Sequence, residues 1–334
     1  MKASAGMPYE VLTFGEAMVR LSPPNFQRLE QAHRFDVQVG GAELNTAAAL
    51  ARLGCSSAWI SRLTLNPLGR LIANRAREAG VGVEHVIWTQ EDRVGVYYVE
   101  FGAAPRASGV LYDRADSAMA RIRPGMVNWA AVFAGAKWFH VTGITPALSA
   151  TAAEATREAL HAARAGKLRT SIDLNYRAKL WSEAEARKWM MEFLPLCDVL
   201  VTTEEDAERV LGVKGSDYED VARQLAQRFP LEVVAITLRE NPLVWKNSWT
   251  AIAYRAGTLY RTRAFEVEIV DRLGAGDSFA AGLIHGLLDG DVQKGLDYGV
   301  AASALKHTIP GDCAWITREE VEAILKGPGL RISR

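Results

Sequence analysis

The chain has 334 residues, enough for one large α/β domain or two smaller domains with a sizeable buried core. Lys plus Arg equals Asp plus Glu at 39 each, so the charge favours neither nucleic acid nor an anionic membrane, and a small-molecule partner is expected. The three cysteines are too few and too widely separated for a disulfide framework or a zinc cluster, which fits a reducing cytosol.

Residues 1–8 begin the chain without the apolar core of a signal peptide, so we expect a flexible N-terminus and a cytoplasmic location. The most apolar stretch, residues 279–288, is interrupted by His285 and two glycines. It is much shorter than the roughly 20 residues that span a bilayer, so it predicts a buried helix and no membrane partner.

Strand-like and helix-like runs alternate from residue 11 onward. A strand at 11–15 and an Ala-rich helix at 41–53 come first, followed by a strand at 58–63 and a helix at 67–79. The same alternation continues with strands at 138–142, 168–173, 199–202 and 233–237 and helices at 151–165, 183–193 and 218–228. Repeated βα units with right-handed crossovers predict an α/β fold with a doubly wound, mostly parallel sheet and helices on both faces.

Two segments, 16–40 and 92–115, break this alternation. The first contains two adjacent prolines and no helical pattern, and the second resembles a hairpin around a Gly/Ala/Pro turn. We interpret them as a small β lid that could cover a site, although ordinary edge strands would give the same pattern. Residues 245–262 predict an antiparallel edge meander. Because no linker or repeat interrupts the chain, we expect a single domain at 9–330 that includes the lid.

The stretch 270–279, Val-Asp-Arg-Leu-Gly-Ala-Gly-Asp-Ser-Phe, joins a predicted strand to a predicted helix. Its glycines allow a ligand to approach the backbone, and the first N–H groups of a helix attract phosphate. Asp277 is either a helix-start residue favoured by the dipole or a base that accepts a hydroxyl proton beside a bound phosphate. Since the chain has no Walker-type motif, any use of a nucleotide would depend on this turn.

Three further motifs lie at the ends of predicted strands. Gly-Gly-Ala-Glu-Leu-Asn at 40–45 opens a helix, either to admit a ligand or to pack tightly on the sheet. Asp-Leu-Asn-Tyr-Arg at 173–177 ends at Arg177, which could bind a carboxylate or phosphate. Arg114 could do the same. For both arginines the alternative is an ion pair at the surface. Thr-Glu-Glu-Asp at 203–206 could hold Mg²⁺ through water or simply begin a capped helix.

The motifs at 40–45 and 271–279 resemble the two signatures of the ribokinase-like (PfkB) carbohydrate kinases, and the similarity extends over nearly the whole chain. Within that family the chain looks most like the branch that phosphorylates 2-keto-3-deoxygluconate, through residues 14–16, 21–24, 112–115, 173–177 and 305–312. The resemblance implies transfer of the ATP γ-phosphoryl group to the C6 hydroxyl of that sugar acid, with ATP and Mg²⁺. The alternatives are a kinase of a neutral sugar or nucleoside and a non-catalytic sugar sensor.

The resemblance also implies roles for individual residues. Asp277 would be the catalytic base, and the Gly274, Ala275 and Gly276 backbone leading to it would form the anion hole. Sugar contacts would come from Gly41, Asn45, Tyr97, Tyr112, Arg114 and Arg177. Thr203 and Thr237, with Gly274 and Gly276, would bind the nucleotide, and Asp206 would bind the metal. The family's Asn-x-x-Glu motif corresponds to Thr-Glu-Glu-Asp at 203–206 in this chain, so both the Asn and the Glu of the motif are replaced. The β lid would close over the sugar and pair two copies of the chain as a homo-oligomer.

Overall fold

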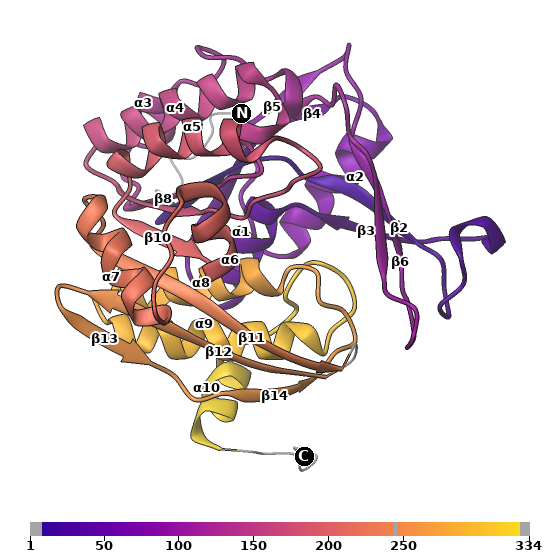
Figure 1. The fold of residues 1–334 in the computed structure, drawn as a ribbon. Coiled ribbons are helices and arrows are strands. Elements are labelled where there is room, and N and C mark those ends of the chain that lie inside the picture. Colours follow the sequence, from indigo (N-terminus) through magenta and orange to yellow (C-terminus); the bar gives the residue numbers. More distant parts are fainter. Residues whose placement is uncertain (1–8, 244–245, 328–334) are drawn as a thin grey trace.

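A 10-stranded sheet forms the centre of the molecule in a computed structural model that describes residues 9–243 and 246–327 (Figure 1). Its strands are β1 (Val11–Phe14), β4 (Ser57–Thr64), β5 (Val86–Thr89), β8 (Trp138–Thr142), β9 (Arg169–Asp173), β10 (Val199–Thr202), β11 (Val233–Leu243), β12 (Lys246–Arg255), β13 (Thr258–Arg261) and β14 (Phe265–Glu268). They lie in the order β13-β12-β11-β10-β9-β8-β1-β4-β5, with β14 beside β12. The segment 1–8, expected to be flexible, lies outside the described residues.

The strands from β11 across to β5 are all parallel, whereas β12, β13 and β14 are antiparallel additions at one edge. The predicted mostly parallel sheet is therefore confirmed. β11 continues to Leu243, beyond the predicted strand end at 237, because its last residues pair with the antiparallel strand β12 rather than with a buried parallel neighbour. The edge strand β5 was not predicted, because three of its four residues are only partly buried and the strand shows no alternation.

Helices cover both faces of the sheet, as predicted. They are α1 (Ala42–Arg52), α2 (Pro67–Glu78), α3 (Trp129–Val132), α4 (Ala150–Ala165), α5 (Glu183–Phe193), α6 (Glu204–Asp206), α7 (Tyr218–Arg228), α8 (Ala275–Leu288), α9 (Val292–His307) and α10 (Arg318–Lys326). Side chains of α4, α5 and α7 share one hydrophobic core, and those of α1, α8, α9 and α10 share another. Among the described residues, no helix is both long and apolar enough to cross a membrane.

A second sheet of four strands stands away from the main body, at the right of Figure 1. It consists of β2 (Met18–Ser22), β3 (Asp36–Gly40), β6 (Val96–Glu100) and β7 (Gly109–Asp113), in the order β3-β2-β6-β7. All four strands come from the segments 16–40 and 92–115. Because side chains alternate along a strand, Arg20 and Tyr97 lie on one face of this sheet, and their neighbours Leu21 and Tyr98 lie on the other.

Candidate functional site

The strand order reverses direction between β1 and β8. From β1 the chain proceeds to β4 on one side, and from β8 it proceeds through β9 and β10 to β11 on the other. In open α/β sheets, ligands bind in the crevice outside the carboxyl ends of the strands at such a point. The residues that follow β1, β8, β9 and β10 are therefore the first candidates for a functional site.

Glu43 fixes the start of α1 at this reversal. Its Oε1 accepts hydrogen bonds from the backbone N–H and the hydroxyl of Thr142, at 3.0 and 2.8 Å, and from the hydroxyl of Thr145, at 2.8 Å. Its Oε2 packs against Gly15, directly after β1, and has no hydrogen-bond donor in the described part of the chain. Burial raises the pKa of Glu43 to about 7. The sequence analysis gave Glu43 no role, because nothing in the motif shows that its carboxyl group is buried.

The motifs at 40–45 and 274–277 meet in space. Asp277 is buried in the first turn of α8, and its Oδ2 accepts a hydrogen bond of 2.7 Å from Nδ2 of Asn45 in α1. Asn45 Oδ1 in turn faces the backbone N–H of Gly41 at 3.4 Å. A Cβ at Gly41 would lie 2.0 Å from the carbonyl oxygen of Glu16, so only glycine allows this close approach. The structure thus joins Gly41, Asn45 and Asp277 into one cluster.

Asp277 has the protonation behaviour that a base requires near neutral pH. Burial raises the pKa of Asp277 to about 6, against the opposing influence of the Asn45 hydrogen bond and of the positive charge of Arg177. At pH 7 the carboxylate is therefore mostly ionised, yet it is more basic than an exposed aspartate.

The substitution Asn45→Ala should move the acid limb of the activity profile. With Asp277 as a base, its carboxylate is the form that can accept a proton, so activity would then fall as the pH drops through about 6. Without the Asn45 amide, which favours the ionised form, the pKa of Asp277 rises and the limb shifts to higher pH. A pH profile of kcat/KM for both proteins measures this shift, and a limb that stays in place would show that Asp277 does not set it.

The turn before α8 has the geometry of an anion site. Gly274 has a φ of 81°, which favours glycine, and a Cβ there would lie 1.9 Å from the carbonyl oxygen of Asp312. At Gly276, by contrast, apart from its neighbours in the chain and the backbone of its own helix, no described atom lies within 4 Å of the place that a Cβ would take, so the surface of the turn is open. The first N–H groups of α8 have no partner within the helix and carry partial positive charge. An anion could therefore bind here beside Asp277.

The positive charge of Arg177, which follows β9, acts on three carboxyl groups, those of Asp173, Asp206 and Asp277. Burial raises the pKa of Asp173 to about 8, with added repulsion from Asp277 and Asp206, and burial also raises the pKa of Asp206. The positive charge of Arg177 lowers the pKa of all three carboxyl groups. Arg177 itself is exposed, and within the described chain its guanidinium group donates one hydrogen bond, from Nη1 to the carbonyl oxygen of Tyr176. Its guanidinium group can therefore bind an incoming anion.

Thr203 caps the short helix α6 by accepting a hydrogen bond of 3.1 Å from the backbone N–H of Asp206. The capped-helix interpretation of residues 203–206 is therefore confirmed, and it leaves the Asp206 carboxyl group near Arg177. In the described residues no three His, Cys, Asp or Glu side chains form a metal cluster. This donor set still suits Mg²⁺, which usually takes one or two carboxylates and completes its shell with water and substrate phosphates.

The lid contributes Tyr97, Tyr112 and Arg114, which the sequence analysis named as sugar contacts. The guanidinium group of Arg114 is not free to bind a ligand through two nitrogens, because its Nε and Nη2 both bind Glu16 Oε2 in a buried ion pair. Only Nη1 has no hydrogen-bond partner among the described side chains. Tyr97 donates its hydroxyl hydrogen bond to Asp312 and stacks on the more exposed Tyr112, with ring centroids 5.9 Å apart.

Arg20 connects the lid to the anion-site turn, a role that the sequence analysis missed. It is 1% exposed, and it donates from Nη1 to Asp312 Oδ2 at 2.6 Å and from Nη2 to Asp271 Oδ2 at 2.7 Å. The sequence signal that could have indicated this role is the charge of Arg20 between the apolar Val19 and Leu21, which suggests that this face of the lid contacts other polar groups. Thr237 lies apart from this cluster in β11, where it pairs with Ala251.

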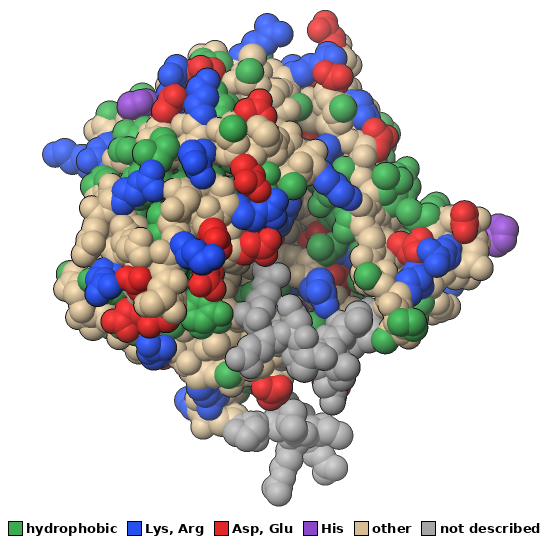
Figure 2. All heavy atoms as spheres, viewed as in Figure 1, with side chains coloured by type: hydrophobic (Ala, Val, Ile, Leu, Met, Phe, Trp, Pro, Cys, Tyr) green, Lys and Arg blue, Asp and Glu red, His purple; other side chains and the backbone are tan. Residues whose placement is uncertain are grey.

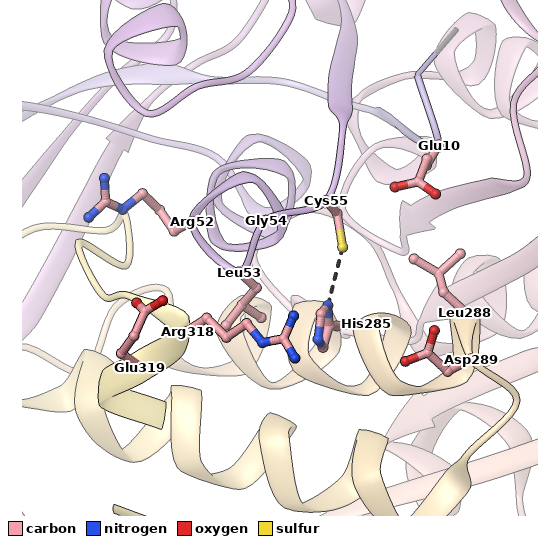
Figure 3. Close-up of a pocket in the computed structure, with 10 residues that line it drawn as sticks. All are labelled: Glu10, Arg52, Leu53, Gly54, Cys55, His285, Leu288, Asp289, Arg318 and Glu319. Carbon is pink, nitrogen blue, oxygen red and sulfur yellow. Dashed lines mark hydrogen bonds between the residues drawn. The ribbon is translucent and has the colours of Figure 1, made fainter. Parts of the chain in front are cut away.

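The face that contains these elements is hollowed between the lid and the body, and acidic and basic side chains gather at its margin (Figure 2). A separate cavity of about 310 Å³, drawn in Figure 3, lies at the opposite ends of α1 and α8. There Cys55 and His285 face each other at 3.3 Å between Sγ and Nδ1. Because this cavity contains none of the candidate residues, it is not part of the site.

Comparison with known proteins agrees with this geometry. The profile of the pfkB family carbohydrate kinases matches residues 9–317. A 2-dehydro-3-deoxygalactonokinase from Haloferax volcanii is 42% identical over 98% of this chain and 100% of that protein, and a 2-dehydro-3-deoxygluconokinase from Thermoproteus tenax is 31% identical over 97% of each. A crystal structure of 2-dehydro-3-deoxygluconokinase from Thermotoga maritima has a TM-score of 0.93 at 41% identity, covering 96% of this chain and 99% of that chain.

Proposed function

Because this chain belongs to the PfkB family of carbohydrate kinases, we propose that it transfers the γ-phosphoryl group of ATP to the C6 hydroxyl of 2-keto-3-deoxygluconate. This sugar acid is the 2-dehydro-3-deoxygluconate in the names of its relatives. The observation that carries the proposal is the meeting of Asp277, Asn45 and the open turn at Gly276, with the positive charge of the exposed Arg177 acting on Asp277.

In this proposal the site acts mainly by positioning and by stabilising charge, because phosphoryl transfer has a loose transition state. Asp277 accepts the proton of the attacking hydroxyl late in the reaction, when the proton has become acidic. The backbone N–H groups of Ala275, Gly276 and Asp277 hold the negative charge that develops on the transferred group. Thr203 and Thr237 would contact the nucleotide, and the lid sheet would exclude water.

The charge of the site supports an acidic sugar. Arg177 presents an exposed guanidinium group, and Nη1 of Arg114 adds a second donor from the lid, next to Tyr112. The Arg177 guanidinium group suits a sugar carboxylate, and Arg114, whose charge Glu16 balances, can add a hydrogen bond; a neutral sugar or nucleoside has no comparable group for Arg177 to bind. The relatives named for 2-dehydro-3-deoxy sugar acids, of both the galactonate and the gluconate type, support the same class.

An ADP-release assay over a panel of acceptors tests this function. The panel contains 2-keto-3-deoxygluconate, its C4 epimer 2-keto-3-deoxygalactonate, fructose, ribose and adenosine, each with MgATP. We expect one of the two sugar acids to give the highest kcat/KM, with the gluconate form preferred. A higher kcat/KM with a neutral acceptor would overturn the substrate class, and no turnover with any acceptor would favour the non-catalytic sensor.

Mg²⁺ would be held by Asp206, with the neighbouring carboxyl group of Asp173, and would supply charge neutralisation to the ATP phosphates. The raised pKa values of both carboxyl groups mean that cation binding must displace protons, so the apparent Mg²⁺ affinity should increase with pH up to about 8. We expect Asp206→Asn to raise the Mg²⁺ concentration needed for half-maximal activity. A Mg²⁺ titration at several pH values checks this, and identical curves for the two proteins would exclude Asp206 as a ligand.

The lid would also pair two copies of the chain. Val37, Leu21, Tyr98 and Leu111 form one row across the four strands, and Val37 and Leu111 are about half exposed. Such an apolar sheet face is suited to a second copy of itself. We therefore expect a dimer by light scattering, which Leu111→Glu should convert to a monomer. A monomeric wild-type protein would contradict this assembly.

A further inference from the structure

Lys306 is a buried positive charge with an unusual set of partners. It lies in the last turn of α9, and its side chain is 0% exposed. Its ammonium group donates to two backbone carbonyl oxygens, those of Asp271 and Ile309, each at 3.1 Å. A lysine is rarely buried to this extent unless a specific interaction compensates the lost hydration.

The two carbonyl groups belong to segments that together build the turn before Asp277. Asp271 begins that turn, and its Oδ2 also accepts a hydrogen bond of 2.9 Å from the N–H of Gly311, two residues after Ile309. The carbonyl oxygen of Asp312 then lies against Gly274, where it leaves no space for a Cβ. The ammonium group of Lys306 therefore sits where the two segments converge.

A simpler role for Lys306 is to cap the end of α9, where basic residues often bind the last carbonyl groups. Other groups already donate hydrogen bonds to the carbonyl oxygens at the end of α9. Leu305 accepts hydrogen bonds from the N–H and hydroxyl of Thr308, and the carbonyl of His307 accepts the N–H groups of Val270 and Asp271. Capping also does not explain the bond to Asp271, which belongs to a different segment.

We infer that Lys306 is a positioning residue for phosphoryl transfer: its ammonium group binds the Asp271 and Ile309 carbonyl oxygens, as a bound monovalent cation would, and holds the anion-site turn in its active shape. Rings of backbone carbonyl oxygens are a common way for proteins to bind such cations. A turn that is fixed before the reaction stabilises charge without reorganising. The inference rests on the proposed function, because it assumes that the turn at 274–277 holds the transferred phosphoryl group.

Chemical rescue of Lys306→Ala tests the inference. The substitution removes the atoms of n-propylammonium and leaves a space of that shape lined by the two carbonyl groups. We expect kcat to fall by about 10²-fold, because a turn misplaced by about 1 Å loses that much, while KM for the sugar acid changes little. Added n-propylammonium should restore much of kcat, and tetramethylammonium, which cannot donate hydrogen bonds, should not.

Two further variants make the result decisive. Lys306→Met keeps most of the side-chain volume without the charge, so it should be slow and should not respond to n-propylammonium. Lys326→Ala, at an exposed position in α10, should behave like the wild type. Wild-type kcat in Lys306→Met, or a folded Lys306→Ala that no propylammonium concentration restores, would overturn the inference. If Asp277→Asn were also fully active, the proposed function of the turn would fail instead.

Discussion

The substitution Asp277→Asn should remove turnover while leaving sugar and nucleotide binding largely intact. Asparagine keeps the size of the side chain and its contact with Asn45, but it cannot accept a proton from the attacking hydroxyl. A positioned base contributes about 10²–10⁴-fold to rate, so kcat should fall by at least about 100-fold. Steady-state kinetics and calorimetric titration of the variant with the sugar acid separate the loss of kcat from any loss of binding.

The same helix provides a matched control for this variant. Asp289 follows the C-terminal end of α8, is largely exposed and pairs with Lys294 at 2.5 Å. Asp289→Asn makes the same chemical change about three helical turns from Asp277. It should keep the wild-type kcat. If Asp277→Asn were as active as Asp289→Asn, Asp277 would not be the base.

Replacing Arg177 by Ala should weaken the enzyme selectively toward acidic acceptors. A hydrogen bond to a charged group contributes about 1.5–3 kcal/mol, so kcat/KM for the sugar acid should fall by roughly 10–150-fold. The loss should appear mainly in KM, and Arg177→Lys should recover part of it, because lysine keeps the charge but not the planar fork. Turnover of any neutral acceptor should change much less, and the ratio of the two kcat/KM values measures the effect.

Arg223 supplies the comparison for this second variant. It is an exposed arginine on α7 that pairs with Asp220 one turn away, and it takes no part in the site. Arg223→Ala should therefore leave both kcat/KM values unchanged. An equal loss for acidic and neutral acceptors in Arg177→Ala would show that Arg177 supports the fold or the base rather than the sugar carboxylate.

Local sequence patterns were sufficient to predict the main sheet, because each βα unit carries its own alternating or helical periodicity. They also placed Asp277 and the residues 40–45 correctly at helix starts. Those patterns describe neighbours along the chain, so they could not show that Asn45 and Asp277 form a hydrogen bond across 232 positions. Only the strand order, with its reversal between β1 and β8, brings the two helix starts together.

The buried charges were the least predictable part of the site. Arg114 was expected to face the substrate, yet Glu16 binds two of its three nitrogens, because a buried guanidinium requires a counter-charge within the protein. Arg20 and Lys306 were not identified, since a lone charged residue in a strand or helix usually lies at the surface. The partners of Arg20, Asp271 and Asp312, lie more than 250 positions from it and could be found only in the folded structure.

The position of the transferred phosphate is the most direct test of the account. Proton-coupled ³¹P NMR of the product formed from 2-keto-3-deoxygluconate and MgATP measures it. An ester at C6 places two hydrogens on the carbon next to the ester oxygen, so the account predicts a triplet, together with the signals of ADP. A doublet, which indicates an ester at a secondary carbon, or ADP with inorganic phosphate alone would contradict it.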